Sequence, residues 1–324
     1  MRTNDLFFNA RWEKHEDRIR ENAKKAMFAD SDTYRRPTLR EWIAGARLRT
    51  LPLAFAPVIA GAGIADAVQS FSLTLTLLAL AVAVLLQIGV NYANDYSDGI
   101  RGTDEFRVGP ARLTGSGEVN PRLVLRAALS CFLGAAVAGL IAVALSGKWW
   151  FLALGVVAII AAWFYTGGKK PYGYMALGEV FVFIFFGLVA TSGTYYLQSD
   201  IVVQEIWWAA AAVGLFAVAV LIANNTRDIA TDKLAGKRTL AVLLGDRASR
   251  VLYVLCVLLP FAVPAVYGLF YSGLVLVFFA LFLVIPSCII MLTGKTPKEL
   301  ILVLQLTSFA ALLYAVLLAL GFAG

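Results

Sequence analysis

The chain has 324 residues, of which 60% are apolar and only 15% are charged, and its mean hydropathy is +0.76. Apolar runs of eighteen or more residues recur along it, which indicates an all-α polytopic membrane protein and argues against soluble domains or a transmembrane β-barrel. The net charge of +7 does not indicate nucleic-acid binding, because we expect the basic residues to gather outside the spans on one side of the membrane.

Residues 1–40 are polar and charged, unlike the rest of the chain. They contain no uninterrupted apolar stretch of the kind found in a cleavable signal peptide. We interpret them as a cytoplasmic N-terminal extension, and a surface amphipathic helix lying on anionic headgroups is the alternative. Residues 41–324 are predicted to form the membrane domain.

Nine apolar segments follow the extension, and each is predicted to be a transmembrane helix. They cover residues 42–66, 73–93, 122–145, 149–166, 177–197, 205–226, 249–271, 273–292 and 299–322. Most Lys and Arg residues fall in the N-terminal segment and in every second connection, whereas the opposite side carries only Lys148. This asymmetry predicts a cytoplasmic N-terminus and a C-terminus on the outer side.

A polar segment, residues 91–117, follows the second apolar run. Asp95 and Asp98 are three positions apart, so on a helical turn they share a face. Asn91 and Asn94 add neutral oxygens on the preceding turn, and a third carboxylate, Asp104, lies further on.

A second polar segment, residues 223–240, repeats this arrangement after the sixth apolar run. Asp228 and Asp232 are four positions apart and share a helical face. Two neutral oxygen donors, Asn224 and Asn225, precede them, and Lys237 and Arg238 follow. Both segments are predicted to lie at the cytoplasmic ends of helices.

Carboxylates at a membrane helix end are costly unless they are paired, and carboxylate and amide oxygens at this density suit Mg²⁺. Arg and Lys side chains around them would neutralise a diphosphate. The candidates are Arg101, Arg107, Arg112, Lys169, Lys170, Arg227, Lys237 and Arg238. For any single basic residue, membrane topology is the simpler interpretation. Arg47, near the start of the first span, either extends to headgroups or binds an anion.

An ion-coupled transporter is a rival interpretation, because such proteins also carry carboxylates in membrane helices. Those carboxylates usually lie near mid-span, whereas the ones here lie at helix ends among basic, Gly-rich loops. This position favours an anionic headgroup that enters from the cytoplasm while an apolar tail lies among the helices. The only histidine, His15, lies in the N-terminal extension, which excludes a His-based triad or His-rich metal site.

The two segments, NDYSDGIRGTD with RVGPARLTGSG and NNTRDIATDKLAGKRTLAVLLG, resemble the aspartate-rich motifs of the UbiA superfamily of intramembrane prenyltransferases. RLRTLP and KPYGYMALGEVFVFIFFGLVATSGTYYLQ resemble the bacterial branch that prenylates 1,4-dihydroxy-2-naphthoate. The resemblance covers roughly residues 42–322. It implies nine helices around a central cavity with a lateral opening for the isoprenoid. The family motif NDxxDxxxD is matched at Asn94, Asp95 and Asp98, but Gly102 stands where the next acid is expected, which leaves Asp104 less secure.

The resemblance implies Mg²⁺-dependent transfer of a polyprenyl group from polyprenyl diphosphate to 1,4-dihydroxy-2-naphthoate, with loss of CO2 and diphosphate, to give demethylmenaquinone in a bacterial inner membrane. Homogentisate, 4-hydroxybenzoate, a chlorophyll precursor and haem remain alternative acceptors. The implied catalytic residues are Asp95, Asp98, Asp228, Asp232 and Lys237. The implied metal ligands are Asn91, Asn94, Asp95, Asp98, Asp104, Asp228 and Asp232. The implied substrate-binding residues are Asn91, Asn94, Arg47, Arg101, Arg107, Arg112, Tyr165, Lys169, Lys170, Asn224, Asn225 and Arg238. The prenyl chain length, the oligomeric state and the role of residues 1–40 are left open.

Overall fold

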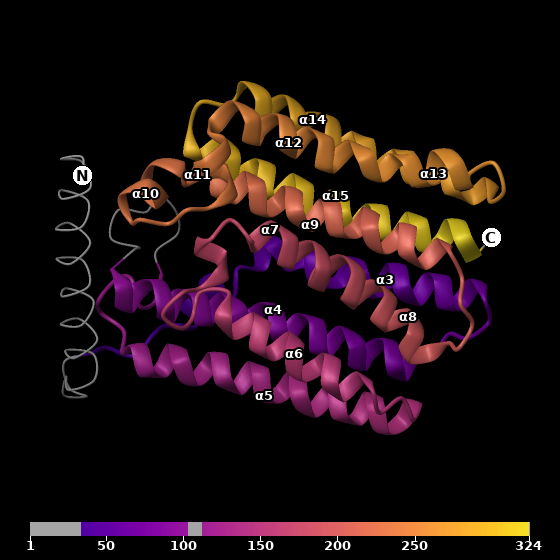
Figure 1. Cartoon of the computed structure of the whole chain (residues 1–324), viewed down its shortest axis with the longest axis horizontal. Helices are drawn as coiled ribbons and strands as arrows, with labels where there is room; N and C mark the ends of the chain where they lie inside the picture. The colour runs from indigo at the N-terminus through magenta and orange to yellow at the C-terminus, as the bar shows by residue number, and fades with distance from the viewer. Residues whose placement is uncertain (1–33, 103–111, 324) are drawn as a thin grey trace, which may run out of the picture.

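The computed structural model describes residues 34–102 and 112–323, and in these ranges all regular elements are helical (Figure 1). Most helices run roughly parallel to the long axis of the molecule. Helices α4, α5 and α6 lie on one side, and α12, α13 and α14 lie on the other, with α3, α9 and α15 between them. The membrane domain predicted from the sequence is therefore a single helical bundle.

The helices follow the predicted segments closely. Their bounds are α2 Leu39–Ala46, α3 Pro52–Ala67, α4 Leu73–Arg101, α5 Pro121–Ser146, α6 Phe151–Phe164, α7 Gly178–Val182, α8 Gly193–Gln198, α9 Glu205–Arg227, α10 Ile229–Leu234, α11 Leu240–Leu244, α12 Asp246–Leu258, α13 Ala262–Tyr267, α14 Leu281–Thr293 and α15 Pro297–Ala323. The π-helix Phe183–Ser192 joins α7 to α8. The 3₁₀ segment Leu259–Phe261 joins α12 to α13, and the 3₁₀ segment Ser272–Ala280 precedes α14.

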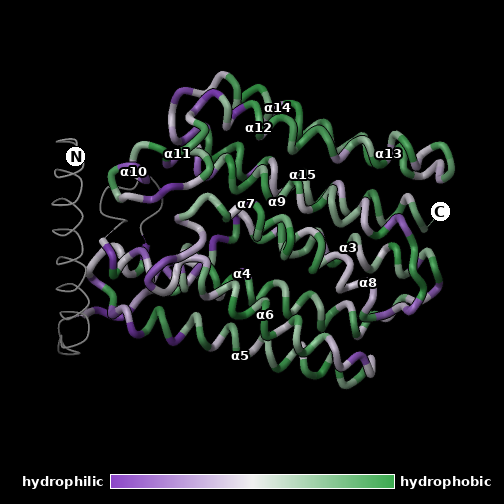
Figure 2. Tube along the Cα trace, viewed as in Figure 1, coloured by the Kyte–Doolittle hydropathy of each residue, from purple (hydrophilic) through white to green (hydrophobic). Residues whose placement is uncertain are grey.

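Among the described residues, seven helices are long and apolar enough to cross a membrane, and the bent pair Leu39–Thr50 and Pro52–Ala67 would make an eighth. The predicted fourth span corresponds to α6, which has only 14 residues. Hydrophilic residues gather at the two ends of the bundle and hydrophobic ones between them (Figure 2). This distribution fits a membrane protein, while nine spans and their orientation stay predictions.

The structure departs from the predicted bounds at two places that shape the site. The first span is broken by 48°, because Arg47 adopts a left-handed backbone with φ 55° and Pro52 starts a new helix. The second helix, α4, runs eight residues past the predicted end at 93 and stops at Gly102, whose φ is 67°. The Asn91–Asp98 segment therefore lies on the last turns of a helix.

Close backbone contacts hold the centre of the bundle together. A Cβ added to Gly63 of α3 would lie 2.2 Å from Ala319 Cβ of α15. A Cβ added to Gly187 would lie 2.6 Å from the Cα of Gly214 in α9. Helices approach this closely only where side chains are absent, so these small residues serve helix packing.

Candidate active site

A cavity of about 750 Å³ opens among the helices, and both polar segments line it. Asp95 and Asp98 reach it from the end of α4, Asp228 reaches it from the junction of α9 and α10, and Asp232 reaches it from α10. The remaining wall is mostly apolar and comes from α3, α4, α5, α6, α9 and the π-helix segment. Two distant parts of the sequence thus meet at one polar end of an otherwise apolar cavity.

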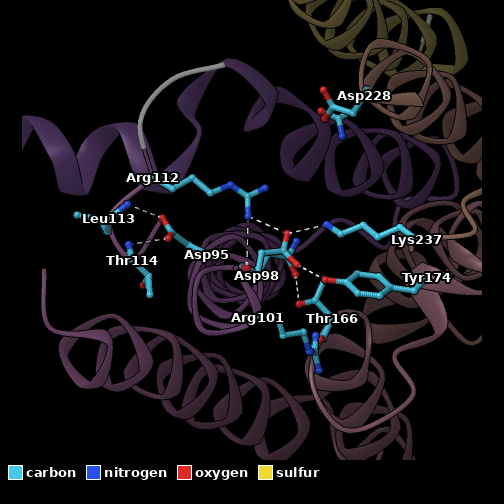
Figure 3. Close-up of polar contacts among 12 residues, drawn as sticks. Asp95, Asp98, Arg101, Arg112, Leu113, Thr114, Thr166, Tyr174, Asp228 and Lys237 are labelled. Atoms are coloured by element: carbon cyan, nitrogen blue, oxygen red, sulfur yellow. Dashed lines mark hydrogen bonds and ion pairs between the residues drawn. The ribbon is translucent and has the colours of Figure 1, made fainter. Parts of the chain in front are cut away.

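Asp98 is the centre of the polar contacts at this end (Figure 3). Its Oδ2 accepts from Arg112 Nη1 at 2.9 Å and from Lys237 Nζ at 3.2 Å. Its Oδ1 accepts from the Tyr174 hydroxyl, and the Asp98 side chain is only 4% exposed. Because Lys237 belongs to the second segment, this contact joins the two segments directly.

Asp95 has different partners from Asp98, although only three positions separate them. Its two carboxylate oxygens accept hydrogen bonds from the backbone N–H groups of Leu113 and Thr114, both at 2.9 Å. Figure 3 shows the Asp95 carboxylate turned towards this loop. Asp95 therefore fixes the loop that presents Arg112 to Asp98.

Asn91 and Asn94 line the cavity and also tie neighbouring elements to α4. Asn91 Nδ2 donates to the carbonyl of Ala46 at 3.0 Å, which fastens the end of α2. Asn94 Oδ1 accepts from the Thr166 hydroxyl at 2.6 Å. Each amide is thus held in one orientation by a contact outside its own helix.

The second segment is ordered by its own polar pairs. Arg227 Nε donates to Asp228 Oδ1 at 2.7 Å, and Arg227 Nη2 donates to Asn224 Oδ1 at 2.9 Å. Asn225 Nδ2 donates to the buried carboxylate of Glu179 at 3.0 Å. These bonds orient the last turn of α9 so that Asp228 faces the cavity.

Electrostatics distinguish Asp232 from the other carboxylates. Burial raises the pKa of Asp232 to about 7; Lys237 lowers it and the charge of Asp228 adds to the increase. Burial lowers the pKa of Lys237, but the negative groups around it, Asp98 first, more than offset this and raise the pKa overall. Lys237 therefore stays charged, and Asp232 is a carboxyl that a nearby cation would readily ionise.

The structure brings some of the predicted basic residues to the cavity and not others. Arg47, Arg112 and Lys237 line it, as does Tyr165. Arg101 instead donates to the carbonyl groups of Thr166 and Gly168 and lies over the Tyr174 ring.

Three further predicted basic residues are exposed and do not line the cavity: Lys169, Lys170 and Arg238. The backbone N–H of Arg238 donates to the carbonyl of Tyr174 at 3.0 Å, so this residue anchors the turn by its main chain. Asp104 and Arg107 lie outside the described residues.

Residues 54–299 match the model of the UbiA prenyltransferase family. The chain belongs to this family. It is 47% identical over 297 residues to the 1,4-dihydroxy-2-naphthoate octaprenyltransferase of Mycobacterium tuberculosis, an alignment that covers 86% of this chain and 95% of that protein.

Solved structures of UbiA homologues share the fold. The apo structure of a homologue from Aeropyrum pernix superimposes with a TM-score of 0.63 at 16% identity, over 83% of this chain and 96% of that one. A homologue from Archaeoglobus fulgidus, bound to GPP and Mg²⁺, gives a TM-score of 0.53 at 16% identity, over 86% and 98%. At these identities the likeness concerns the fold alone.

The donor set at the polar end fits a magnesium ion of the kind the UbiA family uses. Within residues 34–102 and 112–323, no three His, Cys, Asp or Glu side chains converge as a metal cage. Mg²⁺ does not require one, because it is commonly bound by one or two carboxylates together with substrate phosphates and waters. Asp228 and Asp232 are buried and line the cavity, so they are the candidates for such a pair of carboxylates.

Three polar residues of this UbiA-family site were not singled out from the sequence: Gln87, Thr166 and Glu179. Thr166, in the turn after α6, bonds to Asn94, and Glu179 of α7 bonds to Asn225. No local sequence pattern reveals contacts between such distant segments. Gln87 did leave a signal, since it is a polar residue inside an apolar run and precedes Asn91 by four positions on the same helical face.

Proposed function

We propose that this chain transfers a polyprenyl group from polyprenyl diphosphate to 1,4-dihydroxy-2-naphthoate, releasing CO2 and diphosphate and forming demethylmenaquinone in its reduced form. The 1,4-dihydroxy-2-naphthoate octaprenyltransferase of Mycobacterium tuberculosis aligns over 86% of the chain. The observation that carries the proposal is the cavity, which combines one charged end with a long apolar wall. An amphiphilic diphosphate ester has the same division of polarity.

The charged end is suited to hold a leaving diphosphate. Lys237 and Arg112 both form ion pairs with Asp98, at 3.2 Å and 2.9 Å. We assign the magnesium ions of the family to Asp228 and Asp232, with Asp98 and the oxygens of Asn91 and Asn94 as further ligands; a bound ion would neutralise charge that develops on the diphosphate. Fixed cations at this place favour breaking the allylic C–O bond, whose electron pair leaves with the diphosphate.

Aromatic side chains line the cavity next to the charged end. Tyr165 and Tyr172 pack edge to face with ring centroids 5.5 Å apart, and Tyr172 stacks on Phe181 at 4.1 Å. Their faces would stabilise the allyl cation. The ring carbon that carries the carboxylate then bonds to the allylic carbon, and the C–CO2 bond breaks so that its electrons restore the aromatic ring. The apolar wall excludes water that would otherwise capture the cation.

The reaction is tested with purified full-length protein in lipid nanodiscs, supplied with polyprenyl diphosphates of several lengths and 1,4-dihydroxy-2-naphthoate labelled with ¹⁴C in the carboxyl group. We expect a Mg²⁺-dependent prenylated lipid and labelled CO2 in equal amounts. Homogentisate and 4-hydroxybenzoate serve as competing acceptors. Preference for either one, or movement of a substrate without a new covalent bond, would overturn the proposal.

Lys237 is expected to act mainly on diphosphate binding. Replacing Lys237 by methionine removes a charge that is 12% exposed and 3.2 Å from Asp98, so we expect KM for polyprenyl diphosphate to rise about tenfold or more. The matched control is Lys233→Met on α10, an exposed lysine outside the cavity lining. An unchanged KM in Lys237→Met would show that Lys237 does not bind the diphosphate and serves membrane topology alone.

We further propose that the charged end faces the cytoplasm of a bacterial cell, since nearly all Lys and Arg residues lie on that side of the spans. In intact spheroplasts, a membrane-impermeant maleimide should label Val202→Cys, which is 78% exposed at the other end, but not Lys170→Cys. The native cysteines lie in α5, α12 and α14, and unmodified protein controls for them. Labelling in the reverse pattern would invert the topology.

A further inference from the structure

Gln87, a residue of the cavity wall, has a buried hydrogen-bond acceptor without a partner among the described residues. Its side chain is 7% exposed and belongs to the cavity lining. Its Nε2 donates to the carbonyl of Thr50 at 3.0 Å, whereas its Oε1 is buried and has no hydrogen-bond partner in the described part of the chain. A buried acceptor without a hydrogen-bond donor costs free energy, and a donor from a bound ligand would remove that cost.

The orientation of this amide follows from its neighbour. Thr50 ends the 3₁₀ segment Leu48–Thr50 at the break between α2 and α3, and its backbone carbonyl group can only accept a hydrogen bond. The amide NH2 group of Gln87 must therefore face Thr50, because the opposite flip would place two acceptors together. Oε1 is consequently the amide atom that lacks a partner, and a ligand hydroxyl would reach it after a small side-chain shift.

Gln87 also lies at a distance from the charged end of the cavity that suits the aromatic acceptor. It shares one face of α4 with Asn91, Asn94 and Asp98, which are four, seven and eleven positions further along. At about 1.5 Å per residue, Gln87 is roughly 16 Å from Asp98 along the helix axis, towards the apolar interior. A diphosphate at Asp98 followed by the allylic carbon and a bicyclic aromatic ring would span a comparable length.

We infer that Gln87 Oε1 accepts a hydrogen bond from a ring hydroxyl of the aromatic acceptor and so selects hydroxylated acceptors. This inference rests on the proposed function. The prenyl chain has no donor, and the carboxylate of the acceptor has no proton to offer at neutral pH. A phenolic hydroxyl is the only group of the two substrates that donates a hydrogen bond, and the contact places the ring in the wall formed by α4.

The experiment compares wild-type protein with Gln87→Met, which is similar in volume but accepts no such bond. It measures KM for 1,4-dihydroxy-2-naphthoate and inhibition constants for 1-hydroxy-2-naphthoate and 4-hydroxy-2-naphthoate, each of which lacks one hydroxyl. In wild-type protein, one of the two analogues should bind about tenfold more weakly than the dihydroxy compound. In Gln87→Met that preference should fall to about one, with an unchanged KM for polyprenyl diphosphate.

Two further variants separate recognition from structure. Thr194→Val alters another buried side chain of the cavity wall, but its hydroxyl already donates to Ala190 at 2.7 Å, so the preference should not change. Gln87→Asn withdraws the oxygen while keeping an amide, and it replaces Gln87→Met if that variant does not fold. Equal weakening of all three compounds, or no weakening, would overturn the assignment of Gln87. Absence of turnover with 1,4-dihydroxy-2-naphthoate in wild-type protein would instead overturn the proposed function.

Discussion

Replacing Asp98 by asparagine is expected to lower kcat about thousandfold. The Asp98 side chain contacts Arg112, Lys237 and Tyr174 together. Its carboxylate fixes both cations at the end of the cavity where the diphosphate is expected. Preorganised charge of this kind commonly contributes about 10² to 10³ in rate per group, and here two cations depend on one anion. Single-turnover kinetics with saturating substrates measure the effect.

The same substitution also tests whether Asp98 is structural. Removing one partner of a buried ion pair commonly destabilises a protein by about 3–5 kcal/mol, so thermal unfolding must be measured beside kcat. Asp246→Asn is the matched control, since Asp246 pairs with Arg250 at a site where its own side chain is 55% exposed. A variant at Asp98 that folds and turns over like wild-type protein would contradict the site described here.

Replacing Asp232 by asparagine is expected to lower turnover about hundredfold or more and to raise the Mg²⁺ concentration needed for half-maximal activity. Asp232 is 9% exposed, lines the cavity, and makes no ion pair with the described residues. It is therefore the carboxylate most available to a cation. The local backbone should persist, because Lys237 N–H donates to the main-chain carbonyl of Asp232 at 2.8 Å.

The control for this variant is Asp200→Asn, which changes the same chemistry at the other end of the bundle, where Asp200 is 95% exposed beside Lys148. It should leave both turnover and the Mg²⁺ requirement unchanged. If Asp232→Asn lowers turnover without moving the Mg²⁺ requirement, Asp232 acts on substrate rather than metal. If it changes neither quantity, the second segment does not form part of the active site.

In the first acidic segment, the sequence pattern predicted the candidate functional residues but not their contacts. The second span was predicted to end at 93, whereas α4 continues to Arg101 and carries Asp95 and Asp98, both of which line the cavity. Spacing could not reveal that Asp95 binds the backbone of Leu113 and Thr114, because a loop eighteen residues away brings those N–H groups to it. Asp95 was predicted to be a metal ligand, and the structure also gives it a structural role in holding this loop.

The sequence by itself determined the helices, because long apolar runs bounded by polar residues leave few alternatives in a membrane. It also determined which segments carry the charge, since Asp and Asn at helix ends in such a chain need a partner. Only the tertiary structure decided which of these charges meet: Lys237 contacts Asp98, while Lys169 and Lys170 stay on the surface. The physical reason is that hydropathy is a property of each segment and can be read from that segment alone. An ion pair depends on how separate helices pack, and the distance between two side chains on different helices cannot be read from their positions along the sequence.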